Sequence, residues 1–91
     1  MNWTIEIDEK AKDELLKLDR EARKRIIKFI DERLLKLDDP RKLGESLKGN
    51  LSGFWRYRVG DYRLICDIED SKVNILVIGI GHRRNIYKLK F

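Results

Sequence analysis

Three arginines within eight residues are the first candidates for chemistry in this sequence. Arg56 and Arg58 stand two residues apart, and Arg63 follows after Gly60-Asp61. A glycine at the first of two loop residues predicts a tight hairpin turn, which would place Arg58 opposite Arg63. Like charges opposite each other destabilise a sheet, and a bound anion would remove the repulsion. Guanidinium groups match phosphate oxygens, so the pattern favours phosphate chemistry over arginines that are merely solvated or paired with nearby acids.

A second group of reactive side chains follows the last apolar run, in the segment Gly81–Tyr87 (GHRRNIY). Histidine is the side chain most often used for proton transfer in enzymes, so His82 is a candidate for that role. Arg83 is suited to binding phosphate, and Tyr87 to stacking on a base or joining a proton transfer. Each of these residues alone is more typical of an ordinary surface position, so the segment gains weight only together with the arginines.

Composition narrows the class of protein. The chain has 91 residues, 42% of them hydrophobic and 41% charged, which predicts one domain over residues 1–91 with a small core. No apolar run approaches the roughly 20 residues that span a bilayer, and the N-terminus lacks the pattern of a signal peptide. One cysteine and one histidine exclude an internal disulfide and make a zinc site improbable. We therefore expect a cytoplasmic protein with no metal and no membrane partner.

The excess of positive charge lies in the second half of the chain. Residues 48–91 hold nine basic and four acidic side chains, and this excess equals the net charge of +5 for the whole sequence. A surface that binds a polyanion is therefore expected in that half.

The first half predicts a strand followed by a helical hairpin. Residues 3–7 alternate apolar and polar side chains, as a half-buried strand does. Asp8 and Asp19 stand where N-caps of two helices are expected, and Asp38-Asp39-Pro40 would end the second helix. The apolar positions at helical spacing are Ala11, Leu15 and Leu18 in the first helix and Ala22, Ile26, Phe29, Ile30, Leu34 and Leu37 in the second.

The second half predicts strands at 54–59, 62–68 and 73–80, after a polar connection over residues 41–53. The element order is β-α-α-β-β-β, an α+β fold in which the helical hairpin packs on one face of a small, largely antiparallel sheet. Side chains alternate between faces, so the core face is expected to carry Trp55, Tyr57, Val59, Tyr62, Leu64 and Cys66. Cys66 is thus expected to be a buried apolar residue rather than a nucleophile.

The sequence resembles the RelE/ParE superfamily of toxins from type II toxin–antitoxin systems, and most of all its RelE/YoeB-like branch. Three segments carry the resemblance: AKDELLKLD (11–19), LKGNLSGFWRYRVGDYRLICDI (47–68) and GHRRNIY (81–87). The family fold, a small sheet with a helical hairpin on one face, agrees with the element order above.

The resemblance implies a metal-independent, ribosome-dependent endoribonuclease without a cofactor, which cuts messenger RNA in the ribosomal A site. The ribose 2′-OH attacks the adjacent phosphate in this chemistry. The family's site arginines and terminal tyrosine match Arg58, Arg63, Arg83 and Tyr87 by position. RNA binding is expected of Lys48, Arg56, Arg84 and Lys88.

The sequence departs from the family at the proton-transfer groups. RelE carries lysines where Arg56 and Arg58 stand, and arginine is a poor general base because it stays protonated. YoeB-like members use a loop glutamate as the base, and Glu45 falls at a similar place. Glu45 or Tyr87 is therefore the expected base, and His82 the candidate acid.

The resemblance also implies partners and leaves alternatives open. The expected partners are a cognate RelB-like antitoxin, in a toxin–antitoxin hetero-oligomer, and the ribosome with its message. One alternative is a ParE-like inhibitor of DNA gyrase with the same fold. The other is a non-catalytic relative that only binds RNA or an antitoxin.

Overall fold

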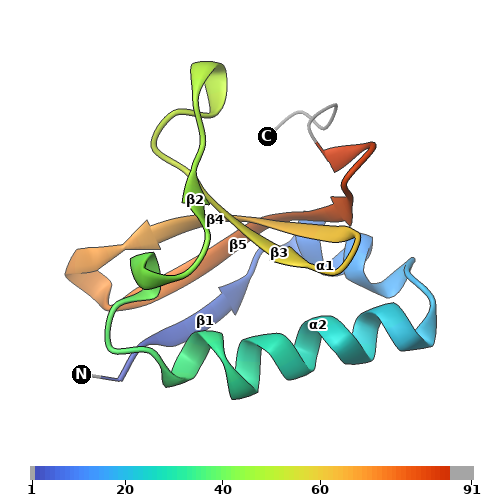
Figure 1. Ribbon diagram of the computed structural model, residues 1–91, viewed down its shortest axis with the longest axis horizontal. Coiled ribbons are helices and arrows are strands. Elements are labelled where there is room, and N and C mark those ends of the chain that lie inside the picture. Colours follow the sequence, from blue (N-terminus) through green and yellow to red (C-terminus); the bar gives the residue numbers. More distant parts are fainter. Residues whose placement is uncertain (1, 87–91) are drawn as a thin grey trace.

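The computed structural model describes residues 2–86 and has two layers, a sheet and a pair of helices on one of its faces (Figure 1). The helices are α1 (Glu9–Leu16) and α2 (Arg20–Glu32). The strands are β1 (Thr4–Ile7), β2 (Glu45–Ser46), β3 (Trp55–Val59), β4 (Tyr62–Glu69) and β5 (Asn74–His82). The predicted α+β fold with a helical hairpin on one sheet face is confirmed. Tyr87 and Lys88 lie outside the described residues.

The sheet has the strand order β1-β5-β4-β3-β2. β1 runs parallel to β5, and the other neighbours are antiparallel. β5 lies between β1 and β4, as its long apolar run predicts. β2 was not predicted, because its two exposed residues carry no apolar alternation. The last strand also continues to His82, two residues beyond the predicted end.

The two helices begin where the aspartates predicted. The Asp19 side chain accepts a hydrogen bond of 2.8 Å from the backbone N–H of Ala22, which satisfies a free amide in the first turn of α2. Asp8 occupies the N-cap position of α1, but its side chain makes no capping bond. α2 ends at Glu32 rather than at the proline, and a single 3₁₀ turn (Leu34–Lys36) carries its apolar stripe onward.

The core fills the space between the helices and the sheet. The predicted core face of the hairpin is confirmed, since Tyr57, Leu64 and Cys66 are fully buried there. Burial raises the pKa of the Cys66 thiol above its ordinary value, which keeps the residue protonated and unsuited to nucleophilic attack. The other buried members are Ala11, Leu15, Ile26, Phe29, Ile30, Leu34, Val59, Ile75, Val77 and Ile80.

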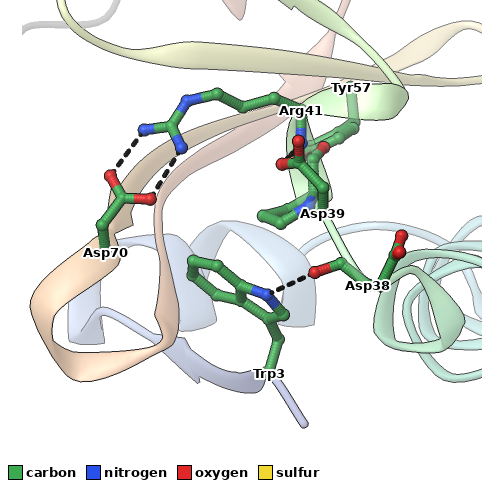
Figure 2. A network of polar contacts seen from close by, with 7 residues as sticks. Trp3, Asp38, Asp39, Arg41, Tyr57 and Asp70 are labelled. Carbon is green, nitrogen blue, oxygen red and sulfur yellow. Dashed lines mark hydrogen bonds and ion pairs between the residues drawn. The ribbon is translucent and has the colours of Figure 1, made fainter. Parts of the chain in front are cut away.

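Polar contacts tie the connection between α2 and β2 to the ends of other strands (Figure 2). The indole N–H of Trp3, just before β1, donates to the Asp38 carbonyl over 3.0 Å. The Arg41 guanidinium forms a bidentate pair with Asp70, which follows β4, with distances of 2.7 and 2.8 Å. The connection is therefore fixed at one end of the sheet, although it contains little regular structure.

Two aromatic side chains of β3 hold the same connection nearer to β2. The Tyr57 hydroxyl donates to the Pro40 carbonyl over 2.7 Å, and the Trp55 indole N–H donates to the Leu43 carbonyl over 2.7 Å. Both donors thereby find partners next to the core, as partly or fully buried polar groups must. These bonds guide the chain to the edge of β3, where β2 pairs.

Candidate functional site

The β3–β4 hairpin has the register that the sequence predicted. Val59 pairs with Tyr62 and Arg58 with Arg63, so Gly60 and Asp61 form a two-residue turn. Gly60 has φ +58°, which the first position of a type II′ turn requires and glycine adopts without strain.

Arg58 and Arg63 form the closer type of cross-strand pair. The Phe54 carbonyl accepts a hydrogen bond from the Leu47 N–H, so the backbone groups of Phe54 point toward β2. Backbone direction alternates along a strand, so the backbone groups of Arg58 also point away from β4. Non-hydrogen-bonded pairs have their Cα atoms about 4.5 Å apart, which brings two like charges together on the face opposite the helices.

The two guanidinium groups of this pair have different surroundings. Arg63 is half-buried, and its Nη1 donates to the carbonyls of Gly60 at 2.9 Å and Tyr62 at 2.8 Å. Arg58 is exposed and forms no ion pair with any acid in the described residues 2–86. The positive charge of Arg58 is thus left without an acidic counterpart in this part of the chain.

Glu45 and Arg56 meet on the same sheet face. They are direct partners in the β2–β3 register, and their side chains form an ion pair. Arg56 is 16% exposed at its side chain and Glu45 is 65% exposed, so the carboxylate reaches solvent while the guanidinium lies deeper. Gly44 permits this approach, because a Cβ there would stand 2.3 Å from the Arg56 carbonyl oxygen. The predicted candidate base therefore lies among the arginines.

The segment after β5 returns to the hairpin turn. The Arg83 N–H donates to the Asp61 carbonyl over 2.8 Å, and the Arg83 Nε lies 3.8 Å from the Asp61 carboxylate. Ile86 is fully buried and folds back over Gly81, where a Cβ would stand 3.2 Å from its side chain. Arg83 therefore lies beside the turn that joins the strands of Arg58 and Arg63, and Arg84 is exposed next to it.

The sheet face opposite the helices carries Arg56, Arg58 and Arg63, and we call it the arginine face. The structure does not bring His82 to this face. His82 is the register partner of Tyr62, and the two rings meet edge to face with centroids 5.7 Å apart. Tyr62 packs against the core, whereas Arg63, the next residue, pairs with Gly81 on the other face. Sheet alternation therefore places His82 on the helix side.

Two segments border the arginine face. The loop between β2 and β3 rises on the side away from the helices, and the segment after β5 rises on the same side (Figure 1). Lys48 is exposed on this loop, directly before a 3₁₀ turn (Gly49–Leu51). The face between the two segments thus combines basic side chains with the Glu45 carboxylate. Residues 2–86 hold no cluster of three acidic, histidine or cysteine side chains that fits a metal ion.

The sequence reasoning missed three basic residues beside Arg58, two of them in α2 and one directly after it. Arg25, Lys28 and Arg33 line a cavity together with Arg58 and the Gly60 turn. The sequence shows them only as charges on the polar side of a helix. Their position becomes visible once α2 is packed along the edge of β3.

A comparison with protein families identifies the chain. The family described as "ParE toxin of type II toxin-antitoxin system, parDE" matches residues 5–87. The chain belongs to this family. The toxin is therefore a component of a type II toxin–antitoxin system, and the resemblance noted from the sequence is confirmed.

Known relatives and solved structures agree with this assignment. Toxin RelG of Mycobacterium tuberculosis is 27% identical over 88 residues, which cover 97% of this toxin and 99% of RelG. The toxin–antitoxin complex RelBE2 of the same organism matches with a TM-score of 0.82 and 25% identity, covering 91% of this toxin and 100% of the matched chain. A free-state structure of an E. coli RelE mutant matches with a TM-score of 0.75 and 27% identity, covering 97% and 93% of the two chains.

The described residues contain no helix that is long and apolar enough to cross a membrane.

Proposed function

We propose that the toxin is a ribosome-dependent endoribonuclease that cleaves messenger RNA in the ribosomal A site and so stops translation. The observation that carries the proposal is the Arg58–Arg63 pair on the open sheet face, with Arg83 beside its turn. Such a group of cations destabilises the free protein and becomes favourable when a phosphate lies among the guanidinium groups.

The proposed reaction is an in-line attack of the ribose 2′-oxygen on the adjacent phosphorus. The O2′–P bond forms, the P–O5′ bond breaks, and a cyclic phosphate and a 5′-hydroxyl are left. A base must take the 2′ proton, and an acid must supply a proton to the leaving 5′-oxygen. Arg58, Arg63 and Arg83 would stabilise the negative charge on the crowded phosphorane, with Lys48, Arg56, Arg84 and Lys88 holding the RNA.

Glu45 is the proposed general base. Its carboxylate is solvent-accessible, lies on the arginine face, and is oriented by its ion pair with Arg56. Arg56 cannot take a proton itself, so its role is to hold the carboxylate and the RNA.

The candidate acid is His82, and Tyr87 is the second candidate base. Tyr87 directly follows Ile86, which folds back over β5. His82 points to the helix side of the sheet, so it would have to act at the rim of the site.

The ribosome would supply what the toxin's own residues do not. A site rich in cations stabilises charge, but it does not by itself align the 2′-oxygen with the leaving group. Holding the message in an in-line geometry is worth several orders of magnitude in rate. We therefore expect weak cleavage of free RNA.

The antitoxin would act by covering these cations. A RelB-like partner that adds a strand or helix to the toxin and brings acidic side chains to Arg58 would compete with RNA for the same charges. The matched RelBE2 structure is a toxin–antitoxin complex, which supports a hetero-oligomer of this kind.

Inhibition of DNA gyrase is the second candidate function. The observation that favours it is the description of the matching family, a ParE toxin. The opposed arginines, the Glu45–Arg56 pair and the segment Gly81–Tyr87 favour the ribonuclease.

Primer extension tests the two functions. The purified toxin is added to a translating extract, and the same message without ribosomes serves as the control. Cleavage that requires ribosomes and falls at A-site positions supports the proposal. If the message stays uncut, a DNA supercoiling assay follows, and inhibition of gyrase in that assay would establish the gyrase function. A toxin that binds ribosomes but does not cut the message would indicate the non-catalytic relative.

A further inference from the structure

A basic groove runs along the edge of the sheet between α2 and β3. Two adjoining cavities of about 210 and 260 Å³ form it, and Phe29, Arg33 and Arg58 line both of them. The larger cavity is also lined by Arg25 and Lys28. We call this feature the α2–β3 groove.

The groove exists because β2 is short. The β2–β3 ladder stops at the Glu45–Arg56 pair. Within the described residues, the part of β3 from Tyr57 to Val59 therefore has a strand beside it only on the β4 side. The backbone groups of Arg58 point to this open side, as the direction of the Phe54 carbonyl indicates.

The groove holds more cations than acids. Glu32 and Glu45 also line it, and Glu45 forms an ion pair with Arg56. Within residues 2–86, no acidic side chain forms an ion pair with Arg25, Lys28, Arg33 or Arg58. The Arg33 guanidinium lies 5.8 Å from the centre of the Phe29 ring, a cation–π contact that leaves its hydrogen-bond donors available. Arg25 packs against the hairpin turn, with Nη1 2.8 Å from the place of a Cβ on Gly60.

We propose that the α2–β3 groove binds the phosphodiester backbone of the same RNA strand where it extends beyond the cleavage site. Arg58 belongs to both the arginine face and the groove, so a strand bound at Arg58 reaches the groove without a break. The span from Arg25 to Arg33 is about 12 Å along the helix axis, enough for about three stacked nucleotides. The inference rests on the proposed ribonuclease function.

The observations favour a nucleic-acid backbone over an acidic peptide. The cavities are open and their charged lining is mostly guanidinium and ammonium, which suits phosphates that remain partly solvated. The apolar side chains that line the two cavities are Phe29, Leu43 and Val59, against seven charged ones, whereas apolar anchors give a bound peptide most of its affinity.

The experiment measures binding rather than cleavage. Fluorescence anisotropy follows the full-length toxin binding to fully 2′-O-methylated single-stranded RNA of 4 and 10 nucleotides, which cannot undergo 2′-oxygen attack. The groove variant is Lys28→Gln/Arg33→Gln. Because Arg33 also packs on Phe29, the single variant Lys28→Gln shows the effect of a lost charge with that packing intact. The matched control is Lys17→Gln/Arg20→Gln, two exposed cations outside the groove lining.

The expected result is a change in salt dependence. Each phosphate contact with single-stranded nucleic acid contributes about 0.7 to the slope of log K against log salt concentration. The double groove variant should lower the slope by about 1.4 for the 10-nucleotide RNA, and Lys28→Gln by about 0.7. The control variant and the 4-nucleotide RNA should show little change.

Other outcomes would overturn the inference without deciding the proposed function. An unchanged slope in the groove variants, with affinity still dependent on Arg58, would show that the strand does not follow the groove. If the groove variants bind the RNA probes normally but sediment less with ribosomes, the groove would be assigned to ribosomal RNA. If they lose only affinity for the antitoxin, it would be assigned to an acidic peptide. A wild-type toxin that binds neither the 4-nucleotide nor the 10-nucleotide RNA would also overturn the inference. The A-site cleavage assay would then decide the ribonuclease function separately.

Discussion

Glu45 on the two-residue strand β2 forms an ion pair with Arg56, its direct partner in the β3 register. The pair places the Glu45 carboxylate at the border of the arginine face, where Arg58 also stands. Its geometry depends on the close backbone approach that Gly44 permits. The position of the proposed base therefore depends on how the chain before β2 is held.

Glu45→Gln should lower A-site cleavage by about 10²–10⁴-fold, the usual contribution of a general base. The fold should survive, because the Glu45 side chain is 65% exposed and the amide retains a hydrogen-bond acceptor for Arg56. Primer extension in a translating extract measures the rate, and Asp31→Asn on the outer side of α2 is the control. A variant that cleaves at the wild-type rate would remove Glu45 as the base.

Arg58→Ala should abolish cleavage while leaving the fold as stable as before or slightly more stable. The substitution removes a like-charge pair with Arg63 and breaks no ion pair within residues 2–86. Urea unfolding is expected to show a gain of about 0.2–1 kcal/mol. Arg63→Ala provides the contrast, because its guanidinium holds the carbonyls of Gly60 and Tyr62. Loss of cooperative unfolding in Arg58→Ala would contradict the face on which we place it.

The hairpin register could be predicted because its determinants are local. A glycine at the first loop position fixes a two-residue turn, and a slip by one residue would have buried Arg58 and exposed Tyr57. Equally short-range patterns predict the core face of the hairpin, the interior position of β5 in the sheet and the role of Asp19 as the N-cap of α2.

β2 and the position of His82 could not be predicted because their determinants are distant in sequence. Residues Glu45 and Ser46 become a strand only because Trp55 and Tyr57 bind the carbonyls of the preceding connection. The face of His82 depends on the β4–β5 register, which contains a bulge between Ile65 and Cys66 that no local pattern reveals.

Gly44→Ala should destabilise the toxin more than Gly49→Ala. Both glycines have positive φ, +81° and +67°, so each alanine carries a backbone strain of about 1–2 kcal/mol. A Cβ at Gly44 also meets the Arg56 carbonyl oxygen, whereas the space around Gly49 is open. Thermal unfolding compares the two variants, and cleavage should fall only for Gly44→Ala because Glu45 shifts. Equal losses of stability would contradict the close approach of β2 to β3.

The Arg41–Asp70 pair should make the stability of the toxin sensitive to acid. Arg41, through its hydrogen bonds and charge, holds the pKa of the Asp70 carboxyl below its ordinary value in the folded state. The stabilisation is therefore fully present above the unfolded pKa of about 3.9 and is lost as the pH falls through the lower folded value. Urea unfolding at pH 7 and near pH 3 should show a smaller acid loss in Asp70→Asn than in the wild type. Arg41→Gln should behave like Asp70→Asn, and the double variant should add nothing further, since the two side chains act as one pair. Additive losses from the two single variants would show that each residue stabilises the connection independently.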